Sequence, residues 1–216
     1  MQEKKRVFWD MGGVLNRFVA DEFLANLADL FRIDALAVAK FFLDGDPALW
    51  HRMEGEPDFD GRKIYECFIK QFGLSPPLRA FYRNFNTGIV PMEHEAELLV
   101  LMADLAQSGV CQGIISNINS IHARYVIRNY QQFFRHIKPR MRFFSYRIGV
   151  RKSRSPDAFK KVFEFSKSGP VSSFLIDDRD SNVEGFCKAG GTGIFFHSVN
   201  ETRYWLEHYG VLGDHK

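Results

Sequence analysis

The sequence is poor in cysteine, and the cysteines that it has are widely spaced. Its 216 residues contain 3 of them, at Cys67, Cys111 and Cys187. Structural zinc sites need cysteines or histidines close together in the chain, and none of these three is so placed. The cysteines therefore favour a reducing compartment and do not indicate a metal site or a disulfide framework.

The chain also lacks a strong charge of either sign and a long apolar run. Its formal net charge of +3 is too small to indicate binding to nucleic acid or to a membrane surface. No apolar run approaches the ~18 residues of a membrane span, and the initial MQEKKR has no signal-peptide apolar core. We therefore expect a cytoplasmic protein with no membrane segment and no nucleic-acid partner, and a monomer or homodimer.

Aromatic side chains are abundant by contrast. The 22 phenylalanines and an apolar fraction of 45% indicate a large, aromatic core in an ordinary globular protein. The length suits one sizeable domain, or one domain that carries a modest insertion.

Two segments differ in their apolar periodicity. From Leu15 to Pro91 the spacing is helical, with no strand signal. Within it, Asp60 is positioned to cap a helix over 62–72, whereas 50–61 is interpreted as a polar connection. Beyond Pro91, short apolar runs alternate with amphipathic helices, and the clearest runs are 112–115, 172–176 and 193–196.

Strands separated by helices in this way indicate a parallel sheet with helices on both faces. The predicted fold is therefore α/β, with a Rossmann-like parallel sheet and an inserted all-helical cap. Residues 1–16 and 90–216 would form the core domain, and 17–89 would form the cap.

Polar groups stand at the ends of three predicted strands. Val7, Phe8 and Trp9 are followed by Asp10, and the later strands end at Ser116-Asn117 and Asp177-Asp178. Ligands of parallel sheets bind at the carboxyl ends of the strands. Each pair alone resembles a helix cap, but the three together indicate a site.

Four motifs in order resemble those of the haloacid dehalogenase (HAD) superfamily, and with the helical insertion the resemblance covers nearly the whole chain. The motifs are DMGGVL at 10–15, IISN at 114–117, GVRK at 149–152 and LIDDRDSNVEG at 175–185. The resemblance implies a phosphatase with a helical C1 cap that forms a phosphoaspartate on Asp10. A carboxylate that attacks a phosphate dianion needs nearby cations, and Mg²⁺ suits such oxygen ligands.

The resemblance also assigns roles to individual residues. Asp10, the carbonyl of Gly12 and Asp178 would hold Mg²⁺, with Asp177 in the inner or outer shell. Further roles fall on Lys152, which would screen the nucleophile, on Ser116, which would hold the phosphoryl group, and on Asn182, which would support the metal-binding loop.

The chain departs from the common pattern at Gly12, where most of these phosphatases carry a second aspartate. That aspartate protonates the leaving oxygen and is worth typically ~10²–10⁴ in rate. Three explanations stay open: another group or water replaces it, the substrate has a good leaving group such as a sugar 1-phosphate, or the protein is not a phosphatase.

Other classes remain as alternatives. A 2-haloacid dehalogenase would use Asp10 without metal, but it has no evident use for Asp177 and Asp178. A phosphonate-cleaving enzyme would need a cap lysine, and nothing distinguishes those at positions 40, 63 and 70. A non-catalytic phospho-ligand-binding protein is also consistent with Gly12.

A second departure surrounds Lys152. The family commonly has proline after this lysine and phenylalanine six residues beyond it, whereas this chain has Ser153 and then Phe159 seven residues on. The apparent insertion makes Arg151 the second choice for the cation of the site.

The substrate contacts are predicted from position along the chain. Ser116, Asn117, Asn119 and His122 follow the second motif, and His122 is a candidate for the missing proton donor, although a helix-surface histidine is the more ordinary interpretation. In the insertion, the segment WHRMEGE at 50–56 resembles the cap segment that faces the active site in related enzymes, which makes His51 and Arg52 candidates for contact with the substrate. The segment SNINSIH at 116–122 resembles a subgroup of sugar-phosphate phosphatases. The expected substrate is therefore a small phosphorylated metabolite, with a sugar phosphate favoured.

Overall fold

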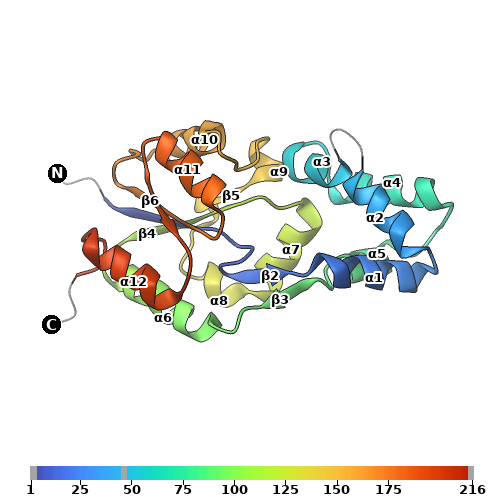
Figure 1. Ribbon diagram of the computed structural model, residues 1–216, viewed down its shortest axis with the longest axis horizontal. Helices are drawn as coiled ribbons and strands as arrows, with labels where there is room; N and C mark the ends of the chain where they lie inside the picture. The colour runs from blue at the N-terminus through green and yellow to red at the C-terminus, as the bar shows by residue number, and fades with distance from the viewer. Residues whose placement is uncertain (1–3, 45–47, 214–216) are drawn as a thin grey trace.

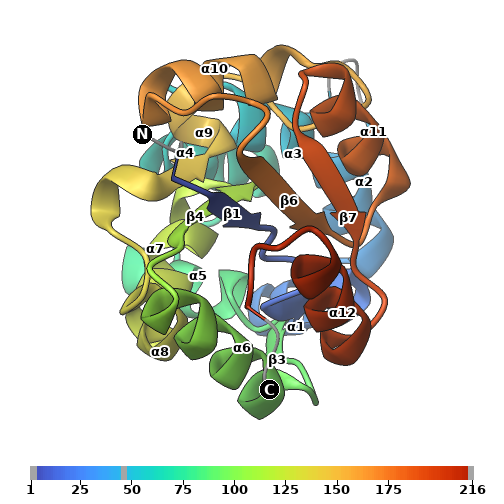
Figure 2. The ribbon, with the colours of Figure 1, turned by 90° about the vertical axis from the view of Figure 1, so that its left-hand side faces the viewer.

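The computed structural model describes residues 4–44 and 48–213. Its centre is a five-stranded parallel sheet in the order β5-β4-β1-β6-β7 (Figures 1 and 2). The strands are β1 (Arg6–Trp9), β4 (Cys111–Ser116), β5 (Arg142–Phe144), β6 (Ser173–Asp177) and β7 (Thr192–Phe195). β1 occupies the middle because its apolar side chains are completely buried, as a strand covered on both faces requires.

Helices cover both faces of this sheet. Figure 2 shows α6 (Glu95–Gln107), α8 (Gln131–Phe134) and α12 (Val199–His208) on one side, and α10 (Asp157–Ser166) and α11 (Asp180–Lys188) on the other. The remaining helices of this part are α7 (Ser120–Asn129), α9 (Ser145–Ile148) and a 3₁₀ turn at Pro139–Met141. The predicted α/β fold with helices on both faces of a parallel sheet is confirmed.

Five helices form a separate layer at one end of the sheet (Figure 1). They are α1 (Ala20–Phe31), α2 (Ala35–Leu43), α3 (Leu49–Gly55), α4 (Gly61–Phe72) and α5 (Leu78–Phe85). Their inner faces share a largely aromatic core that includes Phe23, Phe42, Phe68 and Phe85. We call these helices the helical segment. In the part of the chain that the structure describes, no helix is long and apolar enough to cross a membrane.

Local signals explain where some of these helices begin and end. Asp60 caps α4, as predicted, by accepting hydrogen bonds from the backbone N–H groups of Arg62 and Lys63. The same helix ends at Gly73 in the left-handed conformation, which glycine adopts at little cost.

A two-stranded antiparallel ribbon joins the helical segment to the sheet. It consists of β2 (Asn16–Phe18) and β3 (Ile89–Pro91), so that the chain enters and leaves the segment side by side. Neither strand is predicted from the sequence, because three residues are too few to show an alternating pattern. The predicted limits of the cap, 17 and 89, both fall within this ribbon.

The interpretation of 50–61 as a polar connection was wrong for its first half, which is α3. Met53 is completely buried in the core of the helical segment, and Trp50 packs against Phe18 and Phe23. A helix of seven residues has room for few apolar side chains, and here three of them are balanced by three polar residues and a glycine. Its sequence therefore resembles that of a loop.

Candidate active site

Three neighbouring strands end at the same place with polar side chains. Trp9 of β1 lies opposite Ile114 of β4 and Ile176 of β6, so Asp10, Ser116 and Asp177 come together at the carboxyl edge of the sheet. This edge is where ligands of parallel sheets bind. The structure therefore brings together the three strand ends singled out in the sequence.

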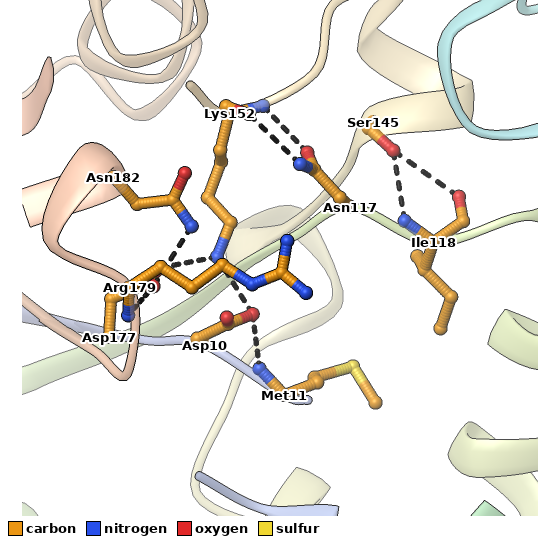
Figure 3. A network of polar contacts seen from close by, with 9 residues as sticks. All are labelled: Asp10, Met11, Asn117, Ile118, Ser145, Lys152, Asp177, Arg179 and Asn182. Atoms are coloured by element: carbon orange, nitrogen blue, oxygen red, sulfur yellow. Dashed lines mark hydrogen bonds and ion pairs between the residues drawn. The ribbon is translucent and has the colours of Figure 1, made fainter. Parts of the chain in front are cut away.

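Lys152 lies between two of these carboxylates. Its Nζ is 2.7 Å from Oδ1 of Asp10 and 2.5 Å from Oδ2 of Asp177, and all three side chains are buried. In Figure 3 they point toward one another from three separate segments of the chain. Ion pairs that are shielded from water are stronger than exposed ones, so the ammonium fixes the orientation of both carboxylates.

The other oxygen of Asp177 is also occupied. Oδ1 accepts a hydrogen bond from Nδ2 of Asn182 at 2.9 Å and another from the backbone N–H of Arg179 at 3.0 Å. Asn182 thus holds Asp177 from the first turn of α11, and it lies where the sequence analysis placed the loop support. With both oxygens engaged, Asp177 is best suited to orienting Lys152.

Asn117 positions the backbone of Lys152. Its Oδ1 accepts a hydrogen bond from the lysine N–H at 2.6 Å, and its Nδ2 donates to the lysine carbonyl at 2.9 Å (Figure 3). Both ends of the amide are therefore used. Asn117 therefore positions Lys152, and because it also lines the cavity described below, its contact with substrate stays a prediction.

The insertion after Lys152 does not displace its side chain. The segment that contains Ser153 packs against Gly185 of α11, where an added Cβ would lie 2.1 Å from the carbonyl oxygen of Ser153. Phe159 is still completely buried and contacts Phe186. The loop absorbs the extra residue, and it is Lys152, not Arg151, that reaches the carboxylates.

Three carboxylates at this edge form a group with the composition of a metal site. Ligand oxygens of Asp10, Asp177 and Asp178 lie within 4.8 Å of one another. Oδ1 of Asp178 is buried and has no hydrogen-bond partner among the described residues. A buried carboxylate oxygen without a partner is costly, and a hard cation would satisfy it. The donor set therefore fits a divalent cation such as Mg²⁺.

The glycine pair shapes the loop around this group. Gly13 has a φ of +86°, and a Cβ there would lie 2.0 Å from Oδ2 of Asp178. The side chain of Asp178 can thus approach the loop only because position 13 is glycine. Gly12 differs, because nothing lies within 4 Å of its added Cβ.

The electrostatics of the site follow from burial and from the excess of carboxylates. Burial raises the pKa of Asp10 to about 7, against the effect of the Lys152 ammonium, and the charge of Asp177 adds to the rise. The pKa of Asp178 is raised by burial and by Asp177. Burial lowers the pKa of Lys152, but its two carboxylate partners outweigh that effect and the net direction is upward. Three carboxylates against one ammonium leave room for further positive charge.

A cavity of about 390 Å³ opens above these residues. Ser116 and Gly12 line its floor together with Asp10, Asp178 and Lys152. The helical segment contributes Trp50 and Glu54 of α3, and the core contributes Arg151 and Arg179. A cavity of this size, with charge on its floor and aromatic and aliphatic walls, suits a small anionic ligand.

His122 does not have the surroundings of a proton donor. It is buried among the rings of Phe18, Phe23, Trp50 and Phe85. Its Nε2 lies 2.9 Å from the carbonyl oxygen of Phe85 and its Nδ1 lies 3.2 Å from Nδ2 of Asn119. Burial lowers its pKa to about 4. The interpretation as a helix-surface histidine is therefore wrong, because the side chain is buried. His122 does line the cavity described above, but a neutral ring with both nitrogens engaged does not favour the predicted role of proton donor.

Two other predicted substrate contacts are also corrected. Asn119 is completely buried, and its Oδ1 caps α7 by accepting from the N–H groups of Ile121 and His122. Arg52 makes two contacts with Glu56, at 2.9 and 3.2 Å, and its guanidinium lies over the ring of Phe59. It does not line the cavity described above.

The segment 50–56 was expected to face the site, but Trp50 and Glu54 line the cavity in place of His51 and Arg52. Arg179 was not predicted as a cavity residue. Trp50 and Glu54 are four residues apart, which places them on one face of α3. This signal exists in the sequence but needs the segment to be recognised as a helix. Arg179 follows the second aspartate of the last motif, and its type alone does not distinguish it from a solvated arginine.

Comparison with solved structures identifies the fold. A HAD family enzyme from Bacteroides thetaiotaomicron, solved in complex with magnesium and inorganic phosphate, aligns with a TM-score of 0.72 at 20% identity, over 90% of this chain and 94% of its own. A predicted HAD-like family hydrolase from Porphyromonas gingivalis aligns with a TM-score of 0.76 at 16% identity, over 95% and 98%. A HAD-superfamily hydrolase of subfamily IA from Geobacter sulfurreducens gives 0.58 at 14%, over 94% and 96%.

The chain therefore has the fold of the HAD-family hydrolases, and the resemblance seen in the four motifs is confirmed at the level of fold. The alignments span nearly all of each chain, so they include the helical segment as well as the sheet. A scan against protein-family models and a search of curated proteins gave no match to the sequence.

Proposed function

We propose that this protein is a Mg²⁺-dependent phosphatase that hydrolyses a small phosphorylated metabolite through an aspartyl-phosphate on Asp10. The observation that carries the proposal is the buried ammonium of Lys152 between Asp10 and Asp177, beside the unpartnered oxygen of Asp178. A structurally similar HAD family enzyme was solved with magnesium and inorganic phosphate, which supports the same ligands here.

Asp10 is the proposed nucleophile. Its Oδ1 accepts a hydrogen bond from the backbone N–H of Met11 and contacts Lys152, which fixes the carboxylate and leaves Oδ2 for attack on phosphorus. Covalent attachment to Asp10 divides a difficult displacement into two easier ones.

Asp10, Asp178 and the carbonyl of Gly12 would hold Mg²⁺, with Asp177 outside the first shell because its oxygens are engaged. The cation supplies positive charge to the phosphoryl oxygens and weakens their repulsion of Asp10.

Lys152 and Ser116 would bind the phosphoryl group. The ammonium is held in place before any substrate arrives, so little reorganisation is needed as charge develops on the phosphoryl oxygens. Ser116 is buried at the end of β4 and lines the cavity, and its hydroxyl would donate to a phosphoryl oxygen.

The walls of the cavity, formed by the helical segment and by the core, would select the rest of the substrate. Trp50 and Phe18 offer aromatic faces, and Arg151 and Arg179 offer hydrogen-bond donors. Such a mixture suits a sugar phosphate, whose ring has both apolar faces and hydroxyl groups. Closure of the segment over the bound substrate would exclude bulk water.

Hydrolysis of a panel of phosphate esters, with Mg²⁺ and with EDTA, tests this proposal. We expect Mg²⁺-dependent release of phosphate by the wild-type protein and none by Asp10→Asn, which keeps the shape of the nucleophile. Absence of turnover on every ester would contradict the phosphatase proposal. Release of halide from 2-haloacids without Mg²⁺ would instead support the dehalogenase alternative.

A further inference from the structure

The cavity contains a buried carboxyl group that the proposed mechanism has not used. It belongs to Glu54 of α3, whose side chain is 8% exposed and lines the same cavity as Asp10 and Gly12. α3 lies at the junction of the helical segment and the core, against α9 (Figure 1). Few glutamates are buried in proteins without a specific reason.

At Gly12, which lines the same cavity, no acid is present. Gly12 has no side chain that could donate a proton, and an added Cβ at this position would meet nothing within 4 Å. A phosphate ester with a poor leaving group needs a proton donor when its P–O bond breaks. Among the described residues that line the cavity, the carboxyl groups are those of Asp10, Asp178 and Glu54, and the first two belong to the nucleophile and the metal group.

The surroundings of Glu54 allow its carboxyl group to change its protonation state. Arg151 donates from Nε to Oε2 at 2.9 Å, and Arg179, from the loop after β6, adds positive charge. On its own helix, His51 is exposed and lies near Arg151, and the Trp50 side chain donates a hydrogen bond. Burial raises the pKa of Glu54 more than these groups lower it.

We propose that Glu54 is the general acid and base of the reaction, in place of the side chain that Gly12 lacks. This inference rests on the proposed phosphatase function. Glu54 acts from the helical segment, so the acid reaches the ester oxygen only when the segment covers the substrate. The site would then be complete only in its closed form.

The proton balances over the two steps. In the first, a lone pair of Asp10 forms the new P–O bond while the bond from phosphorus to the ester oxygen breaks. That oxygen keeps the bonding pair, takes the proton of the Glu54 carboxyl group and leaves as an alcohol. In the second step, water attacks phosphorus and gives a proton to the Glu54 carboxylate. The P–O bond to Asp10 breaks, so phosphate and the original forms of Asp10 and Glu54 are restored.

Arg151 helps Glu54 to gain and lose its proton during the reaction. In the structure it pairs with Glu54, which favours the carboxylate. A phosphate dianion in the cavity adds negative charge near Glu54 and competes for the guanidinium, and both effects favour the protonated carboxyl group. Once the proton has been given to the leaving oxygen, Arg151 again stabilises the carboxylate.

The test compares two classes of ester in Glu54→Gln. An alkyl phosphate such as glycerol phosphate needs protonation of its leaving oxygen, whereas p-nitrophenyl phosphate does not. We expect kcat/KM to fall by about 10²-fold or more for the alkyl ester and by less than about 10-fold for the aryl ester. Glu56→Gln is the matched control, because it removes a carboxylate that contacts an arginine Nε at the end of the same helix but lies outside the cavity.

A rescue experiment then asks whether the lost function is proton transfer. Because the space beside Gly12 is open, Gly12→Asp places a second carboxyl group at the cavity that Glu54 lines. Added to Glu54→Gln, it is expected to restore at least about 10-fold of the rate on the alkyl ester. If Glu54 served only to hold Arg151, the new aspartate would restore nothing.

A measurement on the wild-type protein covers the case in which Glu54→Gln does not fold. For the alkyl ester, kcat/KM should fall as the pH rises through the raised pKa of Glu54, and this fall should be absent for the aryl ester. Equal pH profiles for the two esters, or equal losses in Glu54→Gln, overturn the inference. Wild-type activity in either case leaves the phosphatase proposal intact, whereas an inactive wild type contradicts that proposal itself.

Discussion

The side-chain amide of Asn117 binds both backbone groups of Lys152, at 2.6 and 2.9 Å, across 35 positions of the sequence. Because Asn117 directly follows the last residue of β4, the strand end fixes the point at which the lysine leaves its loop. The Lys152 ammonium therefore reaches Asp10 and Asp177 although the loop that carries the lysine has one extra residue.

Asn117→Ala should therefore lower activity by releasing Lys152. A misplacement of about 1 Å can cost about 10²-fold in rate, so we expect a loss of that order in kcat with a smaller change in KM. Phosphate release from an active ester measures both constants. Asn129→Ala, which removes an exposed asparagine on α7, is the matched control and should leave them unchanged.

The loss should also depend on Lys152. If Asn117 acts only through the lysine, adding Asn117→Ala to Lys152→Ala should cost little more than Lys152→Ala alone. Fully additive losses in this double-mutant cycle would show that Asn117 acts on the substrate directly.

Asp178→Asn should stabilise the protein without metal and abolish its stabilisation by Mg²⁺. Burial and the nearby charge of Asp177 raise the pKa of Asp178, so its charged form disfavours the folded state at neutral pH. The neutral amide removes this repulsion and also removes a proposed metal ligand. Thermal unfolding with EDTA and with Mg²⁺ should show both effects, and Asp58→Asn, at an exposed position, should show neither. An unchanged Mg²⁺ response in Asp178→Asn would remove Asp178 from the proposed ligand set.

The sequence was sufficient to predict the sheet and the strand ends, for a physical reason. A buried parallel strand must be apolar and must stop where polar chemistry begins, so Val7 to Asp10 and Ser173 to Asp177 show both features locally. Each strand end can be recognised from a short stretch of chain. The order of these strand ends along the sequence was then enough to predict the fold.

Contacts between distant segments could not be predicted in this way. Glu54 meets Arg151 across 97 positions, and Asn117 meets Lys152 across 35, so neither pair leaves a local pattern. His122 was misjudged for the same reason. Its position on α7 resembles an exposed one in sequence, but the chain folds Phe18, Trp50 and Phe85 around it.

His122 should make the stability of the protein depend on pH. Its pKa is about 4 in the folded state and near 6.5 in the unfolded state. As the pH falls, the unfolded state therefore binds a proton at this histidine before the folded state does. The free energy of unfolding should therefore fall as the pH falls from about 6.5 to about 4, by roughly 3 kcal/mol in total. Urea unfolding at several pH values measures this slope.

Replacing the histidine should reduce that slope. His122→Gln keeps a donor for the carbonyl of Phe85 but does not titrate, so its unfolding free energy should vary less over the same pH range. His208→Gln, at an exposed position on α12, is the control and should keep the wild-type slope. A slope that survives in His122→Gln would assign the pH dependence to other groups.

The two glycines after the nucleophile should respond differently to the same substitution. Gly13 has a φ of +86° and its added Cβ would lie 2.0 Å from Asp178, whereas the Cβ of Gly12 meets nothing within 4 Å. Gly13→Ala should cost about 1–2 kcal/mol for the left-handed backbone alone and should also displace Asp178 from the proposed metal group. We expect lower unfolding free energy and weaker stabilisation by Mg²⁺. Gly12→Ala, at an adjacent open position, should change the unfolding free energy by less than about 1 kcal/mol. Equal losses in the two variants would contradict the loop geometry on which the metal group depends.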